Sequence, residues 1–441
     1  MDGTMGDTQK SPTISTKLHQ IAQQAKEHPD RIFISLAHLM DVDFLREGFR
    51  RTRKDGASGV DGITAEEYSR DLEGNLTSLH TRMREGRYRA QPVKRGWITK
   101  EDGSQRPLGM PVFEDKIAQR TVSMLMSAVY EQDFYDFSYG FREGRSPHQA
   151  IAALREQCYR ENTHWIIDAD ITKFFDNLDH GNLRELIRKR INDGGIIRLI
   201  GKWLNAGVLE GADLSYPDKG TPQGGVISPL LANIFLHYVL DEWYVKEIKP
   251  RLKGRSFLIR FADDFIIGCE SEEDARRIMA VLPKRFARFK LTIHPEKTKL
   301  VDFRSPQWRR KTATSKHTFD FLGFTHYWGK SRNGKWVIKR KTASKRIRRT
   351  LKSIWQWCYE NRHWSLPEQH RILSSKLRGH YNYYGIRGNY KMLEVVYEQV
   401  LYSWKRWLGR RHRDGFISWE DFQSKILQVF PLPLPRVVHL I

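Results

Sequence analysis

The chain has 441 residues, of which 75 are Lys or Arg and 52 are Asp or Glu, so its formal net charge is +23 at pH 7. A positive surplus of this size favours a polyanionic partner, of which nucleic acid is the commonest. With 39% hydrophobic and 12% aromatic residues the chain can bury large cores, which excludes a largely disordered protein, and its length suggests about three domains or lobes.

The three cysteines, Cys158, Cys269 and Cys358, are few and far apart. They support neither a disulfide framework nor a cysteine-based zinc site. No apolar run approaches the ~20 residues that a membrane span needs. The polar residues 1–12 do not resemble a signal peptide. We therefore expect a cytoplasmic protein, in a reducing compartment, without a membrane partner.

The N-terminal region, residues 1–40, is predicted to be a polar leader followed by a helix. Its apolar side chains recur at helical spacing, at Leu18, Ile21, Ala22 and Ala25. Such a helix packs on a core through one side and carries little chemistry.

Residues 98–109 predict a β-hairpin that turns at Asp102 and Gly103. Lys100 and Arg106 fall on its two arms. Two cations on one hairpin suit a triphosphate, although two solvated charges explain the pattern equally well.

Residues 165–171 have the composition of a strand, and its period of two predicts that Asp168 and Asp170 share one face. Phe174 and Phe175 follow at once, and core packing is the commoner fate of such side chains. The strand therefore offers carboxylates to a site, with aromatic bulk beside it.

Residues 219–225 predict a glycine loop that leads into a helix. A loop of this kind brings backbone close to a planar ligand. The buried stripe expected on the helix is Leu231, Ile234, Phe235, Tyr238 and Val239.

Two adjacent acids, Asp263 and Asp264, lie inside the apolar stretch 257–267. Strand-forming residues on both sides predict a β-hairpin with the acids at its tip. An isolated Asp-Asp pair is ordinary turn chemistry. Flanked by buried strands, the pair suits a divalent cation held against a substrate phosphate, and a carboxylate from residues 165–171 can join it.

The order of these segments resembles the reverse transcriptases encoded by bacterial group II introns. The resemblance continues into residues 376–389 and 404–411, which are similar to the thumb, or maturase, region of that family. Seven motifs in order carry it: Arg106-Pro-Leu-Gly, Tyr139-Gly-Phe-Arg, Asp170 with Phe174-Phe175-Asp176, Gly220-Thr-Pro-Gln-Gly-Gly, Phe261-Ala-Asp-Asp, His294-Pro-Glu-Lys-Thr-Lys and Phe321-Leu-Gly-Phe.

The resemblance implies that Asp170, Asp263 and Asp264 are the metal-binding carboxylates of a polymerase palm. Two Mg²⁺ ions would there activate the primer 3′-hydroxyl and stabilise the leaving pyrophosphate. Lys297 matches the lysine thought to protonate pyrophosphate. Asp168 is not the catalytic position of the family, although strand parity alone does not exclude it.

The resemblance also implies residues that bind the dNTP and the primer. Lys100 and Arg106 match the residues that hold the triphosphate, and Gln223 matches a loop residue beside the nucleotide. Phe175 matches the ring under the sugar, which would exclude a 2′-hydroxyl. The primer grip of the family matches Phe321, Leu322, Gly323 and Phe324.

Eight Lys or Arg residues lie between Lys339 and Lys352, beside an apolar stripe at helical spacing. On a thumb-like helix they would follow the backbone of a template–primer duplex, with binding that weakens as salt rises. A solvated helix face is the alternative. The candidate nucleic-acid-binding residues are Lys345, Arg346, Arg348, Arg349 and Lys352.

Two departures from the family pattern matter. Phe261 stands where tyrosine is usual, which removes a hydroxyl and keeps the ring, so we expect activity to survive. After Trp404 there is no His- and Cys-rich cluster resembling the endonuclease domain of many relatives. Second-strand cleavage by this chain is therefore not expected.

We expect an α+β fold, a right-hand polymerase with fingers and palm followed by an α-helical thumb. The expected divisions are an N-terminal leader and helical extension (1–40), fingers and palm (41–325), a thumb or maturase domain (326–412) and a short C-terminal tail (413–441).

The expected function is RNA-directed DNA synthesis from dNTPs on an RNA template and a DNA primer. The family adds binding of the parent group II intron RNA for splicing and of a DNA target for mobility. Two alternatives stay open: a host-recruited reverse transcriptase in defence or repair, and an RNA-binding splicing cofactor with a vestigial polymerase site. The intact Asp170, Asp263 and Asp264 argue against the vestigial site.

Overall fold

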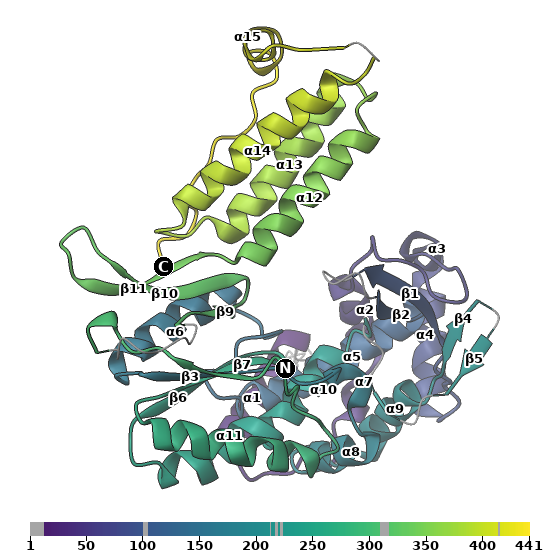
Figure 1. Cartoon of the computed structure of the whole chain (residues 1–441). Helices are drawn as coiled ribbons and strands as arrows, with labels where there is room; N and C mark the ends of the chain where they lie inside the picture. The colour runs from purple at the N-terminus through teal and green to yellow at the C-terminus, as the bar shows by residue number, and fades with distance from the viewer. Residues whose placement is uncertain are drawn as a thin grey trace, which may run out of the picture.

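Helices and three separate sheets make up the protein (Figure 1). The predicted α+β class is therefore confirmed. Arg106 is described by its backbone alone. The computed structural model describes residues 13–99, 105–211, 213–216, 219–220, 224–308, 317–412 and 415–441.

The N-terminal helices pack around one long helix, α5 (Phe113–Tyr130). Apolar residues occupy all sides of α5, so most of it is buried. The helices α1 and α2 contact it directly. Ile21 and Ala25 are buried on α1, as the helical spacing predicts. The bounds of these helices are α1 Ile14–Glu27, α2 Val42–Arg51, α3 Ala65–Ser69 and α4 Leu72–Arg84.

A first sheet, with strand order β2-β1-β4-β5, lies beside these helices. Thr99 pairs with Gln105 and Lys94 with Met110, so the hairpin predicted at residues 98–109 is confirmed. Its tip, residues 100–104, lies outside the described residues. The strands are β1 Val93–Thr99, β2 Gln105–Met110, β4 Val208–Glu210 and β5 Asp213–Ser215.

The central sheet has the order β6-β7-β3-β8 and is antiparallel throughout. Successive side chains of a strand point to opposite faces. Phe265 and Ile267 accordingly pack into the core that contains α11, whereas Ile266 packs into the core that contains α6. Burial on both faces explains the continuous apolar runs in the sequence. The strands are β3 Trp165–Ala169, β6 Ser256–Phe261, β7 Asp264–Cys269 and β8 Lys299–Asp302.

Six helices connect or cover these strands. One of them, α10, begins at Ser228 and continues into a π-helical segment, His237–Asp241. The predicted stripe of α10, from Leu231 to Val239, is buried. The helices are α6 Pro147–Arg160, α7 Phe174–Asn177, α8 His180–Arg188, α9 Gly194–Leu204, α10 Ser228–Leu236 and α11 Glu272–Ala287.

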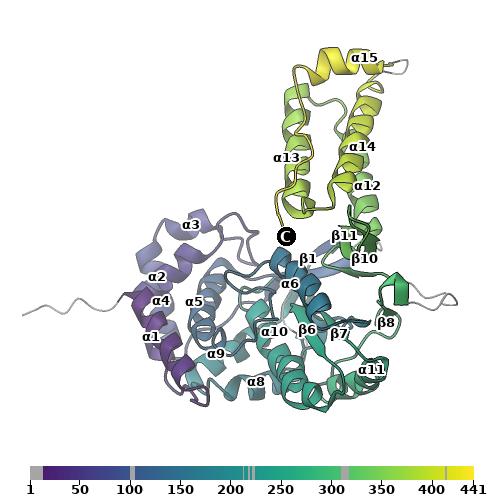
Figure 2. The same ribbon diagram turned by 90° about the vertical axis from the view of Figure 1, so that its left-hand side faces the viewer.

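A third sheet, β11-β10-β9, leads into a three-helix bundle that extends away from the rest of the molecule (Figure 2). Leu373, Leu377, Val396 and Trp404 form part of the core of the bundle. The elements are β9 Phe319–Phe321, β10 Phe324–Lys330, β11 Trp336–Thr342, α12 Ser344–Glu360, α13 Leu366–Tyr384 and α14 Tyr390–Leu408.

The residues after the bundle fold back along it. A short helix, α15 (Trp419–Asp421), is followed by Phe422 and Leu432, which are buried in the core of the bundle. The chain then pairs Ile386 with His439 near the base of the bundle, where the C-terminus lies (Figure 1).

The described helices include none that is long and apolar enough to cross a membrane. The three cysteines are buried and carry free thiols. Burial raises the pKa of the Cys269 thiol to about 12, so it stays protonated at neutral pH.

Candidate active site

The acidic turn, which we define as Ala262, Asp263 and Asp264, joins β6 to β7. Phe261 pairs with Asp264, so the two residues of the turn itself are Ala262 and Asp263. Ala262 has a φ of 57°, the left-handed conformation found in two-residue hairpin turns. The strands behind the turn are buried, whereas Asp264 is exposed. The predicted placement of both acids at a hairpin tip is confirmed.

Asp170 directly follows β3, at the end of the central sheet where the acidic turn lies. Ala169 pairs with Phe265 in the antiparallel ladder of β3 and β7, so the residue after Ala169 comes opposite the residue before Phe265. Asp170 therefore lies opposite Asp264. Its carboxylate forms an ion pair with the Nζ of Lys297 at 3.0 Å.

The segment that carries Lys297 also fixes the backbone of Asp170. The amide of His294 donates to the carbonyl of Asp170 at 2.8 Å, and the amide of Asp170 donates to Oγ1 of Thr298 at 3.3 Å. The Lys297 side chain is 64% exposed, so its ammonium group is accessible to a substrate. This segment therefore holds both an acid and a cation at the edge of the sheet.

Asp168 is a further carboxylate beside the acidic turn. It lines a cavity together with Asp264, Asp320, Lys345 and Arg346. Burial, and then the negative charges of Asp264 and Asp320, raise the pKa of Asp168 to about 7. Strand parity in the sequence drew attention to Asp168, but nothing in the sequence indicated Asp320, because the strand that carries it reaches this cavity only through the fold.

The donor chemistry of this edge suits a divalent cation. Asp170, Asp263 and Asp264 supply hard carboxylate oxygens, which Mg²⁺ prefers. The pKa of Asp168 is raised first by burial and then by the neighbouring carboxylates of Asp264 and Asp320, so negative charge gathers beside the acidic turn. Within the described ranges, no three His, Cys, Asp or Glu side chains are close enough together to hold a metal ion. The three carboxylates thus fit Mg²⁺ by their donor type, although in this structure they do not form a preformed metal cluster.

Phe175 lies on α7, which begins four residues after Asp170 in the chain. Its side chain is half-buried, and its ring makes an edge contact with the buried Phe174 at 5.3 Å between centroids. The glycine loop reaches the same helix, because the amide of Gly220 donates to the carbonyl of Leu178 at 2.8 Å. The loop and Phe175 are thus neighbours.

The other predicted dNTP-binding residues are only partly described. Lys100 and Gln223 lie outside the described residues. Arg106 is placed by its backbone, which pairs with Ile98 in the first sheet. Their assignments stay predictions.

The Leu322–Gly323 turn joins β9 to β10 and lines the same cavity as Asp168 and Asp264. Both turn residues have positive φ, 48° for Leu322 and 81° for Gly323. The flanking Phe321 and Phe324 are buried. Of the four predicted primer-grip residues, Phe321, Leu322 and Gly323 therefore line the cavity, whereas Phe324 packs in a core.

The end of α13 holds the Leu322–Gly323 turn. The hydroxyl of Tyr383 donates to the carbonyl of Leu322 at 3.0 Å. The ring of Tyr383 stacks on Phe324 at 6.0 Å, and a Cβ added at Gly323 would lie 3.0 Å from the hydroxyl of Tyr384. No local sequence pattern indicates this contact, because Leu322 and Tyr383 are 61 residues apart in the chain.

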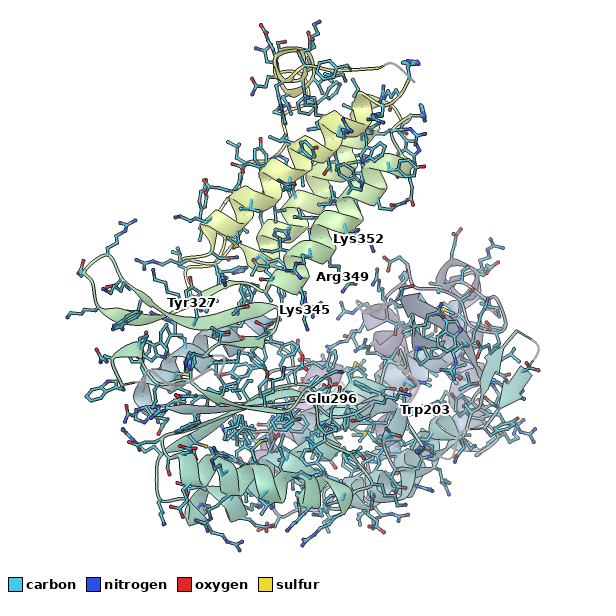
Figure 3. All side chains as sticks on the ribbon, viewed as in Figure 1. Trp203, Glu296, Tyr327, Lys345, Arg349 and Lys352 are labelled. Carbon is cyan, nitrogen blue, oxygen red and sulfur yellow. The ribbon has the colours of Figure 1, made fainter. Side chains whose placement is uncertain are left out.

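The five predicted nucleic-acid-binding cations lie on α12, and all are exposed. Lys345 and Arg346 line the cavity beside the two turns. Lys345, Arg349 and Lys352 project from α12 towards the side on which the N-terminal helices and the first sheet lie (Figure 3). Ile354 on the opposite side is buried in the bundle. The predicted division of this helix into a packed side and a cationic side is confirmed.

Comparison with known proteins shows which family this chain is similar to. The family model described as reverse transcriptase (RNA-dependent DNA polymerase) matches residues 98–326, which include both turns and Asp170. The chain is 28% identical over 487 aligned residues to the group II intron-encoded protein LtrA of Lactococcus lactis subsp. cremoris, covering 91% of this chain and 78% of that protein.

Two further relatives widen the comparison. Protein YkfC of Escherichia coli (strain K12) is 32% identical over 326 residues, which cover 65% of this chain and 84% of that protein. The putative COX1/OXI3 intron 1 protein of Saccharomyces cerevisiae is 25% identical over 456 residues, which cover 86% of this chain and 53% of that protein. The similarity thus extends beyond the family model into the three-helix bundle.

Proposed function

The chain belongs to the reverse transcriptases, as a member of the group II intron-encoded proteins, and from this premise we propose that the acidic turn and Asp170 form its polymerase centre. It is an RNA-directed DNA polymerase with an intron maturase role, as its sequence predicts. The observation that carries the proposal is the strand register, which sets Asp170 opposite Asp264 and next to the turn that contains Asp263.

Asp170, Asp263 and Asp264 would hold the divalent metal ions that reverse transcriptases use, here two Mg²⁺. When bound, Mg²⁺ lowers the pKa of the primer 3′-hydroxyl and stabilises negative charge on the leaving pyrophosphate. The work of the chain is to position the carboxylates. Three strands of the central sheet, β3, β6 and β7, hold them, so little freedom is lost when the substrates arrive.

Lys297 is the proposed proton donor to pyrophosphate. Its Nζ lies 3.0 Å from the carboxylate of Asp170, which keeps the ammonium group at the reacting edge of the sheet. A proton on Nζ would move to the leaving oxygen as the bond from the α-phosphate breaks. Phe175 is proposed to lie under the sugar, where its half-buried ring would exclude a 2′-hydroxyl. The roles of Lys100, Arg106 and Gln223 in holding the triphosphate rest on the family resemblance.

The proposed path of the template–primer duplex runs between the two turns and α12. The Leu322–Gly323 turn would hold the primer end, since it shares a cavity with Asp264. The cations of α12 would contact phosphates, because all five are exposed and two of them, Lys345 and Arg346, line that cavity. The proposed partners are an RNA template, a DNA primer, the group II intron RNA and a DNA target.

The polymerase centre is tested by dTTP incorporation on poly(rA)/oligo(dT) with Mg²⁺. We expect Asp263→Ala to lower incorporation on the order of 10³-fold or more, because a metal ligand is lost. Asp43→Ala, which removes an exposed carboxylate on α2, is the matched control and is expected to retain activity. Equal activity of wild type and Asp263→Ala would refute the assignment of the centre.

The maturase role is separated from polymerisation by the double variant Asp263→Ala/Asp264→Ala. We expect it to bind intron RNA and support splicing while DNA synthesis is lost. Loss of both activities in a folded variant would mean that one surface serves both.

A further inference from the structure

A buried ion pair lies directly behind the acidic turn. Arg260, two residues before Ala262 on β6, and Asp241, at the end of the π-helical segment after α10, both have fully buried side chains. The Nε of Arg260 donates to Oδ1 of Asp241 at 2.8 Å, and its Nη2 donates to Oδ2 at 2.6 Å. Two parallel hydrogen bonds of this kind fix the orientation of the guanidinium group as well as its position.

The third nitrogen of Arg260 reaches the acidic turn itself. Its Nη1 donates to the carbonyl oxygen of Ala262 at 3.1 Å and to Oδ1 of Asn233 at 2.9 Å. Asn233 in turn donates from Nδ2 to the carbonyl of Gly140 at 2.7 Å. One side chain thus links a helix, a neighbouring loop and the left-handed residue of the turn.

Gly140 packs directly against the backbone of the turn. A Cβ added at Gly140 would lie 2.2 Å from the amide nitrogen of Ala262, so the two backbones are in direct contact. The loop that carries Gly140 pairs with β6, since the amide of Tyr139 donates to the carbonyl of Arg260 at 2.9 Å. Ala262 is therefore held at both of its peptide groups, by Arg260 at its carbonyl oxygen and by Gly140 beside its amide nitrogen.

A fully buried ion pair is a weak source of stability, because two charges lose their hydration and well-packed apolar residues often replace them without loss. Positioning is a better explanation here. The left-handed backbone of Ala262 is unfavourable for a residue with a side chain and persists only where surrounding contacts impose it. Arg260 supplies such a contact, because it binds the carbonyl of Ala262, which forms the peptide bond to Asp263.

We propose that the Arg260–Asp241 pair positions the acidic turn, fixing the carbonyl of Ala262 and thereby the carboxylates of Asp263 and Asp264 for nucleotide transfer. This inference rests on the proposed polymerase centre. It assigns Arg260, Asp241 and Asn233 as positioning residues, which act on the reaction only through the turn.

The test replaces both charges by apolar groups of similar size, in Arg260→Met/Asp241→Leu, so that no lone charge stays buried. The matched control is Arg190→Met/Asp133→Leu. That pair is also largely buried, with Nε of Arg190 2.7 Å from Asp133, but its remaining donors bind carbonyls of residues 25–31 near α1. Single-nucleotide incorporation gives kcat and KM for dTTP, and hydrogen exchange reports on the peptide covering residues 257–267.

We expect the first double variant to lower kcat about 100-fold, as a small displacement of catalytic groups does, with KM for dTTP within about twofold. Amide exchange at the acidic turn should accelerate at least about tenfold, as local opening predicts. The control variant should change neither quantity. Wild-type kcat and wild-type exchange in the first variant would overturn the proposal.

Asn233→Leu provides a second test if the first variant does not fold. It leaves the Arg260–Asp241 ion pair intact and removes the hydrogen bonds of Asn233 with Nη1 of Arg260 and with the carbonyl of Gly140. A roughly tenfold loss of kcat supports positioning, and a kcat within about twofold of wild type overturns it. Activity in Asp263→Ala would instead show that the polymerase centre is misassigned, and hydrogen exchange at residues 257–267 would still decide whether the pair holds the turn.

Discussion

The acidic turn and the Leu322–Gly323 turn have similar backbone conformations but are held in place by different contacts. Each joins antiparallel strands through two residues, each contains a non-glycine residue in the left-handed region, and both line one cavity. The acidic turn is held by a buried guanidinium and carboxylate. The other turn is held by a tyrosine hydroxyl and by the amide of Ala343, which donates to the carbonyl of Gly323.

The anchors of the two turns differ because the turns carry different chemical groups. A turn that carries two carboxylates is pushed apart by their repulsion, so a rigid, charge-assisted anchor is needed to hold it. A turn that offers backbone and apolar side chains to a primer has no such repulsion, and neutral hydrogen bonds of about 1 kcal/mol each are sufficient. Its anchor comes from α13, so the helical bundle can influence how the primer is held.

The largest effect should come from removing the negative charge of a proposed metal-binding carboxylate while keeping the shape of its side chain. We expect Asp264→Asn to lower kcat on the order of 10³-fold, because an amide is a poor Mg²⁺ ligand. In the Leu322–Gly323 turn, Leu322→Met also keeps the volume of the side chain but removes no charge. We expect this variant to have a kcat within about twofold of wild type. Steady-state dTTP incorporation measures both variants. A loss of similar size in Leu322→Met would show that the two turns do not differ in this way.

The next largest effect should come from Gly140, whose added Cβ would meet the amide nitrogen of Ala262 at 2.2 Å. Backbone atoms cannot rotate away, so Gly140→Ala must displace the acidic turn. We expect kcat to fall about 100-fold. Gly379→Ala on α13 is the control, since beyond the backbone of its own helix and its chain neighbours its added Cβ would meet nothing within 4 Å. A Gly140→Ala variant with wild-type kcat would mean that the turn tolerates displacement.

Acidification should weaken the sheet that carries the Leu322–Gly323 turn through His326. This side chain is 1% exposed and stacks on Phe319, and burial lowers the pKa of His326 to about 3. Below the ordinary pKa of about 6.5 the unfolded chain binds a proton that the folded chain does not. Stability is therefore full above that pH and falls below it, by about 2 kcal/mol from pH 6.5 to pH 5.

Urea unfolding, followed by tryptophan fluorescence at pH 7 and pH 5, measures this loss in the free energy of unfolding. His326→Phe keeps the stack and should reduce the loss on acidification by that amount. His363→Gln, which alters an exposed histidine, should leave the loss unchanged. An identical pH dependence for His326→Phe and wild type would contradict the assignment.

The smallest effect should come from Tyr383→Phe, which removes only the hydrogen bond to the carbonyl of Leu322. A neutral hydrogen bond contributes about 1 kcal/mol, so the Kd for a template–primer duplex should rise about fivefold. We expect kcat at saturating duplex to stay unchanged. Tyr402→Phe on α14, exposed and remote from both turns, is the control. A fall in kcat rather than in affinity would show that this turn also positions the reacting groups.

The sequence predicted the elements whose signals are local. Apolar runs on both sides of Asp263 and Asp264 indicated two buried strands, and the stripe beside the cations of α12 indicated a helix with one packed side. Such patterns depend on the periods of strand and helix, which neighbouring residues carry. The family resemblance supplied the roles of these residues, and the domain boundaries drawn from it stay predictions.

Only the tertiary structure decided which distant residues meet. The register of β3 against β7 sets Asp170 opposite Asp264, and the same fold brings Asp320 near Asp168 and Tyr383 to Leu322. Arg260 in the sequence is one cation in an apolar run; its partners Asp241 and Asn233 lie on another element. Periodicity determines which face of an element is buried, but the pairing of faces depends on the packing of the whole chain.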